Sequence, residues 1–127
     1  RLEMGRYLLS EDYVRALAGR EVLRREVDAA LAGHDALVTP TLPIPPPLIG
    51  ATTIRVGATE EPARNLMLRL TSLFNMTGHP AIALPAGTTS AGLPCSTQLV
   101  GVRGQTDAPP RVALTCEGVP RGQARER

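Results

Sequence analysis

Residues 73–102, LFNMTGHPAIALPAGTTSAGLPCSTQLVGV, contain two short apolar segments on either side of a turn. The first segment, residues 80–85, has a proline at each end, and the second, residues 97–102, reads TQLVGV. Between them, Gly87 and Gly92 can adopt the positive φ angles that tight turns require. The pattern predicts two buried strands that pair antiparallel across a hairpin, with Gln98 making structural hydrogen bonds inside the sheet.

Two amphipathic helices are predicted before this hairpin. Residues 11–31 repeat apolar side chains at a helical period, between Ser10 as the expected cap and Gly33 as the stop. Residues 59–77 begin with a capping threonine, carry Pro62 in the first turn and present a broad apolar face. Each helix therefore has an apolar face that must be buried, and we expect the predicted strands to cover it.

The other segments are shorter. Residues 36–39 are apolar on both faces, which predicts a central strand covered on both sides. Residues 40–47 hold five prolines and exclude regular structure; a proline-rich recognition peptide is the less favoured alternative, because the segment lies inside a folded region. Residues 53–56 predict one edge strand. Residues 112–117 predict a last helix, capped by Thr106 or Asp107, with the preceding proline pair tolerated only in its first turn.

This order of elements predicts an α/β fold in which helices flank a mixed β-sheet. The core must be aliphatic, because the chain is 43% hydrophobic but only 2% aromatic. The chain opens on Arg1 in a helical context, so we expect residues 1–117 to be the C-terminal part of a larger domain. A sheet cut from its neighbours would leave open edges and exposed apolar faces. We expect residues 118–127 to be a disordered tail.

Composition limits the function classes. The net charge is only +2, and all 14 basic residues are arginine, so the chain lacks the strongly basic surface of a nucleic-acid-binding protein. No apolar run reaches the ~20 residues of a membrane span. Cys95 and Cys116 have no metal-binding spacing, and we expect them to be reduced in a cytoplasmic protein.

No complete catalytic constellation is visible in the sequence. The serines are Ser10, Ser72, Ser90 and Ser96, and none lies in a Gly-x-Ser-x-Gly elbow. His34 follows a helix-ending glycine and His79 lies at a helix-to-strand junction, which are positions where imidazoles commonly have structural roles. Phosphate-loop and dinucleotide fingerprints are absent as well. Residue chemistry alone predicts a module without its own active site, metal or cofactor.

Four ordered motifs resemble the amidase signature family. Residues 35–43, DALVTPTLP, are similar to its DALLTPTxP segment, and residues 74–81, FNMTGHPA, to its FNxTGxPA segment. LPAG at residues 84–87, and GLP and QLVG at residues 92–94 and 98–101, follow in the family's order. The resemblance is collinear from residue 1 to about residue 117.

The resemblance implies an α/β/α fold and hydrolysis of carboxylic amides through an acyl-enzyme intermediate. The family's Ser-Ser-Lys triad lies in its N-terminal half, and this chain has neither a lysine nor a Gly-Gly-Ser-Ser-Gly run. We therefore expect no catalytic residue in this chain. Its role would be to complete the scaffold and to form part of the wall of a pocket for a small amide. Six residues are candidates for that wall: Thr39, Pro40, Thr41, Asn75, Thr77 and His79.

Some residues depart from the family pattern. Cys95-Ser96-Thr97 replaces a glycine-containing triplet, and Pro109-Pro110 replaces leucines. One branch, the glutamine-hydrolysing component of the tRNA-dependent amidotransferase, is expected to carry a carboxylate near Leu68 that binds the substrate ammonium. Because that carboxylate is missing, a general amidase is the main interpretation. The amidotransferase component and a non-catalytic remnant are the alternatives. The substrate and the oligomeric state stay open, and nucleic-acid and membrane partners are not expected.

Overall fold

The computed structural model describes residues 3–117, and the expectation for residues 118–127 lies outside this range. A short 3-10 helix, η1 (Glu3–Tyr7), leads into the long helix α1 (Ser10–Leu31), followed by strands β1 (Leu37–Pro40), β2 (Thr53–Val56) and β3 (Thr59–Pro62). Two short helices, α2 (Ala63–Leu68) and α3 (Ser72–Thr77), precede strands β4 (Ala81–Thr88) and β5 (Pro94–Val100) and helix α4 (Ala108–Glu117). The predicted α/β class is confirmed.

The main sheet has three strands in the order β1-β5-β4, and both pairings are antiparallel. The predicted hairpin is β4–β5, in which Leu84 is opposite Thr97 and Ile82 is opposite Leu99. The register shifts between Pro85 and Gly87: Pro85 is opposite Ser96 and Gly87 is opposite Cys95, so β4 has one extra residue at this point. We expected a mixed sheet. Within residues 3–117 all the strand pairings are antiparallel.

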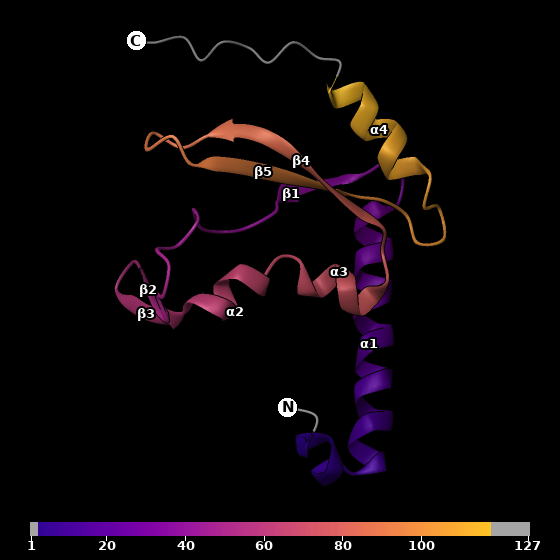
Figure 1. The fold of residues 1–127 in the computed structure, drawn as a ribbon. Helices are drawn as coiled ribbons and strands as arrows, with labels where there is room; N and C mark the ends of the chain where they lie inside the picture. Colours follow the sequence, from indigo (N-terminus) through magenta and orange to yellow (C-terminus); the bar gives the residue numbers. More distant parts are fainter. Residues whose placement is uncertain (1–2, 118–127) are drawn as a thin grey trace.

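The two faces of the sheet pack against different helices (Figure 1). Leu99 and Val100 are consecutive in β5, so their side chains point to opposite faces. Val100 packs with Val27, Leu31 and Phe74 from α1 and α3. Leu99 packs instead with Leu84 and with Ala113 of α4. The sheet is therefore the middle layer between α4 on one face and α1 with α3 on the other.

Three expectations about the elements were wrong. Strand β1 is not central: it is an edge of the three-stranded sheet, with Val38 exposed, because only β5 pairs with it in this part of the chain. Helix α1 begins at Ser10, which was expected to be its cap; Leu9 occupies the cap position instead, and no side chain caps the helix. The last helix begins at Ala108 rather than Val112, which places its two prolines in the first turn, where their missing N–H groups are harmless.

The predicted helix over residues 59–77 is divided into three elements. Residues 59–62 form β3, which pairs with β2 across a turn in which Gly57 has a φ of 61°. Helices α2 and α3 are then separated at residues 69–71. At that break the Leu70 carbonyl accepts a hydrogen bond from Gln98 Nε2 at 3.2 Å. An unbroken helix would offer this carbonyl to Phe74 N–H, so a tertiary hydrogen bond replaces a helical one.

Candidate functional site

The six predicted wall residues occupy three different environments. Thr41 and Asn75 line one cavity, beneath the sheet and against α2 and α3. Thr39 and Pro40 lie in β1, and Pro40 borders a separate depression beside the proline-rich loop. Thr77 and His79 are buried at the end of α3. Of the six, the structure therefore brings only Thr41 and Asn75 together in this cavity.

Thr77 and His79 belong to a buried polar network. The two nitrogens of the His79 ring lie 2.9 Å from Thr77 Oγ1 and 3.0 Å from Asp28 Oδ1. Thr77 Oγ1 also donates to the Leu73 carbonyl at 3.0 Å, and Arg103 donates to Asp28 Oδ2 at 3.4 Å. The network resembles a nucleophile, base and acid in its residue types only. Thr77 has 0% exposure and His79 has 5%, so no substrate can reach the hydroxyl.

Two arginines of α1 complete the attachment of α1 to α3. Arg20 Nε donates to the Met76 carbonyl at 2.6 Å, and Arg24 Nε donates to the Thr77 carbonyl at 3.0 Å. These carbonyls are at the C-terminus of α3, where helical partners are lacking and positive charge is favourable. The Gly78 N–H, at a φ of 77°, closes the same helix end on Phe74. The FNMTGHP motif therefore joins two helices through polar contacts.

The acid in this network has a shifted titration. The hydrogen bond from His79 lowers the pKa of the Asp28 carboxyl below its ordinary value of 3.8; burial opposes this shift, and the charge of Arg103 adds to it. A lowered folded-state pKa means that ionised Asp28 stabilises the fold at pH values above 3.8. That contribution is lost as the pH falls through the lowered value.

We predict that Asp28→Asn reduces the free energy of unfolding at neutral pH, and that the difference from the parent chain narrows as the pH falls below the ordinary carboxyl value. Urea unfolding at pH 7, 5, 3 and 2 measures this difference. Asp35→Asn is the matched control, since Asp35 is an exposed carboxylate and forms no salt bridge with another residue among 3–117. A gap for Asp28→Asn that stays constant down to pH 2 would contradict the assignment.

The cavity that contains Thr41 and Asn75 has a volume of about 680 Å³. Its walls come from the loop after β1, from α2 and α3, and from β4 and β5. They are formed by Thr41, Arg64, Leu68, Thr71, Ser72, Phe74, Asn75, Ala81, Ile82, Ala83 and Gln98. The size is that of a site for a small molecule, and six of the eleven lining residues carry polar side chains. Neutral hydroxyl and amide groups of this kind can hydrogen-bond both ends of a carboxamide.

Gln98 holds this cavity in shape. It is only 4% exposed, and its Nε2 donates to the Leu70 carbonyl and to the Pro40 carbonyl, at 3.2 and 3.4 Å. The prediction of a structural amide is thus confirmed. The bonds link β5 to the α2–α3 break and to the start of the proline-rich loop. Thr41 continues that loop, and its Oγ1 is buried without a hydrogen-bond partner among residues 3–117.

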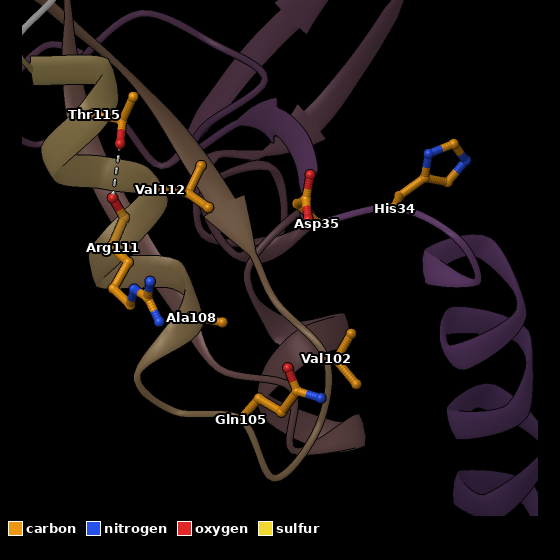
Figure 2. Close-up of a pocket in the computed structure, with 8 residues that line it drawn as sticks. All are labelled: His34, Asp35, Val102, Gln105, Ala108, Arg111, Val112 and Thr115. Atoms are coloured by element: carbon orange, nitrogen blue, oxygen red, sulfur yellow. Dashed lines mark hydrogen bonds between the residues drawn. The ribbon is translucent and has the colours of Figure 1, made fainter.

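A second cavity, of about 570 Å³, lies between α4 and the segment after α1 (Figure 2). Arg111 and Thr115 approach it from α4, and His34 and Asp35 from the opposite side. The only hydroxyl among its labelled residues, that of Thr115, donates to the carbonyl of Arg111 within its own helix at 3.1 Å. The group contains no nucleophile activated by a base, so this cavity is the weaker candidate for chemistry.

The described residues hold no activated serine. Ser72 lines the cavity beside Asn75, but no hydrogen bond connects a serine side chain to His34 or His79 within residues 3–117. Nucleophilic catalysis needs such a neighbouring base. In the same part of the chain, no three His, Cys, Asp or Glu side chains are grouped to hold a metal ion. Among the described residues, the cavity therefore has no means of its own to attack a bound amide.

Arg64 and Ser72 are among the cavity residues that the sequence did not predict to line a pocket. Arg64 reads as a residue on the wet face of a helix, and Ser72 as a residue inside one. Only the break between α2 and α3 turns both toward the same space. The break is accompanied by a hydrogen bond from Gln98, which is 28 residues away in the sequence. The residues around the break therefore do not predict it by themselves.

Comparison with known proteins identifies the family. The sequence model of the family described as Amidase matches residues 1–108. The chain belongs to the amidase family. A crystal structure of an amidase superposes with a TM-score of 0.83 at 34% identity, over 91% of this chain and 26% of that one. The resemblance read from the four motifs is therefore confirmed.

Two curated relatives show the range within this amidase family. A glutamyl-tRNA(Gln) amidotransferase subunit of Synechococcus sp. (strain CC9605) is 39% identical over 108 residues, which are 80% of this chain and 21% of the relative. The 6-aminohexanoate-cyclic-dimer hydrolase of Paenarthrobacter ureafaciens is 36% identical over 94 residues, 68% of this chain and 19% of the relative. The chain thus spans about a fifth of the length of these relatives.

Proposed function

We propose that this chain forms one wall of the substrate pocket of an amidase that hydrolyses small carboxylic amides at the C–N bond. The observation that carries the proposal is the cavity of about 680 Å³ between α2, α3 and the sheet. It is built from the same motifs, FNMTG and the TPT loop, through which the sequence resembles the family. Its hydroxyl and amide groups face a space of the right size for a small amide.

The chemistry itself belongs to residues outside this chain. The resemblance implies a Ser-Ser-Lys triad that forms an acyl-enzyme, and the sequence contains no lysine. Residues 3–117 supply the pocket wall and its rigid support, in which Gln98 and the Asp28–His79 network fix the positions of the loop and of α3. No metal or cofactor is required by this division of labour.

The exposed surface supports a larger assembly. The accessible surface is 10058 Å², whereas a folded monomer of 13.5 kDa exposes about 6,500 Å². Even if the 12 residues outside 3–117 contributed about 1,900 Å², the value for an unfolded chain, the accessible surface would still exceed that of a folded monomer of this size. Several large side chains at the end of η1, before α1 and in the first turns of α1 are exposed: Tyr7, Leu8, Leu9, Tyr13 and Val14. A surface of this kind fits a segment that other parts of an amidase fold cover.

A second candidate function is that of the glutamine-hydrolysing component of a tRNA-dependent amidotransferase. It is favoured by the 39% identity to a glutamyl-tRNA(Gln) amidotransferase subunit. The cavity argues for the first candidate, because Leu68 lines it where the resemblance places a carboxylate in that branch. Release of glutamate from glutamine by the full protein, together with genes for partner proteins beside its own, would favour the second candidate.

The cellular setting is also part of the proposal. No helix among the described residues is long and apolar enough to span a membrane. Cys95 and Cys116 are both exposed free thiols, which supports a reducing compartment such as the cytoplasm. The proposed partner is a small amide.

Benzamide hydrolysis tests the division of labour. We predict that the purified chain releases no ammonia from benzamide above the buffer rate, because no serine within residues 3–117 is hydrogen-bonded to an activating base. A cooperative melting curve for the same sample shows that the chain is folded during the assay. Measurable turnover that disappears when one of the chain's own serines is changed to alanine would refute the proposal.

A further inference from the structure

The cavity between α2, α3 and the sheet has one charged side chain in its wall, that of Arg64 in α2. Its other polar side chains are neutral, and no Asp or Glu lines it. The nearby acid Glu61 in β3 is already paired with Arg69. A ligand in this cavity therefore meets a positive charge that no cavity carboxylate balances.

Arg64 also differs from most arginines in the described part of the chain. Side-chain hydrogen bonds to carboxylates or carbonyls are made by Arg15, Arg20, Arg24, Arg25, Arg69 and Arg103. Arg64 makes none within residues 3–117. Arg111 also lines a cavity, but Asp35 lies in the same wall. Arg64 thus combines a free guanidinium with a cavity that has no competing acid.

The neutral groups nearby suit the amide end of a ligand. Ser72 lines the cavity with a hydroxyl that can donate and accept a hydrogen bond. Asn75 lines the same cavity with an amide that can both donate and accept. Leu68 and Ile82 provide apolar wall for a short carbon chain. The cavity offers a place for an amide, a spacer and an anion.

We propose that Arg64 selects amides that also carry a carboxylate over neutral amides and over amides that carry an ammonium group. The inference deepens the proposed function and rests on it, because it assigns a substrate class to the same cavity. Arg64 is exposed, so its ion pair with the ligand is partly screened by solvent. We expect a preference of about two- to fivefold for an anionic over a neutral amide, weakening with added salt.

Three ligands of matched length test the selection: succinamate, succinamide and β-alaninamide, with charges of −1, 0 and +1. Their dissociation constants are measured by NMR titration of the full chain, following the backbone signals of the cavity residues. We expect the affinity to fall in the order given. Equal affinities, or tightest binding of β-alaninamide, would overturn the selection by Arg64 and leave the amide pocket standing. Absence of shifts in the cavity with every amide would overturn the pocket itself.

Variants assign the preference to the side chain. Arg64→Gln should bring succinamate and succinamide to equal affinity, and Arg64→Glu should reverse the order in favour of β-alaninamide. Arg55→Gln, which removes an exposed arginine on β2 outside the cavity, should leave the order unchanged. Matching melting temperatures confirm that the variants are folded. An Arg64→Gln variant that keeps the full preference for succinamate would overturn the proposal.

Discussion

Gly101→Ala is expected to lower the free energy of unfolding by about 2–3 kcal/mol. Gly101 directly follows β5, is buried, and donates its N–H to the Pro80 carbonyl at 2.9 Å. A Cβ at this position would lie 2.5 Å from Cγ and 2.9 Å from Cδ of Pro109. Pro109 is itself almost fully buried, and its ring cannot rotate away as a flexible side chain could. Either α4 moves off the sheet or the strand end shifts.

Urea denaturation of matched variants measures this effect. Gly19→Ala is the control, because Gly19 is exposed in α1 with nothing within 4 Å of its would-be Cβ, so alanine should stabilise the helix by about 0.5–1 kcal/mol. The double variant Gly101→Ala, Pro109→Ala should recover part of the loss, since the obstructing ring is gone. A neutral Gly101→Ala variant would show that α4 does not pack on the sheet as described.

His79→Leu is the second change with a large expected effect, a loss of about 2–4 kcal/mol. The imidazole side chain is completely buried, and both of its nitrogens are within hydrogen-bond distance of a partner, Thr77 on one side and Asp28 on the other. Leucine keeps the volume but removes both interactions and leaves Asp28 with Arg103 alone. Helices α1 and α3 should then separate more readily than the sheet unfolds.

Hydrogen exchange shows where His79→Leu acts. Faster exchange should be concentrated in α1 and α3, with β4 and β5 less affected. His34→Leu is the control: His34 is exposed, so its replacement should change stability by less than about 0.5 kcal/mol. Equal stability of the His79→Leu and His34→Leu variants would contradict the buried network.

The elements that sequence reasoning predicted well depend on local chemistry. The α3 stop at Gly78 and the β4–β5 hairpin require glycines and prolines at particular positions, and those residues are visible in the sequence. Helix 59–77 failed because its break coincides with a hydrogen bond from Gln98 and its first residues pair with β2. Both contacts are tertiary, and neither changes the helical spacing of the apolar residues from which the helix was predicted.

The candidate site was predictable in part for the same reason. The family motifs indicated Thr41 and Asn75, and these two residues do line the cavity; their role toward a substrate stays a prediction. Thr77 and His79 share the motif with Asn75 but are buried in the protein interior. Residues two apart on a helix, such as Asn75 and Thr77, face nearly opposite directions. Arg64 was missed, since a charged residue on an amphipathic helix is ordinarily explained by contact with solvent.

The most direct test of the pocket is an NMR titration of the chain with benzamide, followed residue by residue. We predict progressive shifts at the cavity residues Thr41, Ser72, Asn75 and Gln98, without hydrolysis of the ligand. Signals of Gln105 and Arg111, at the other cavity, should not move. Shifts confined to Gln105 and Arg111, or no shifts at saturating benzamide, would contradict the claim that this part of an amidase forms a wall of the amide pocket.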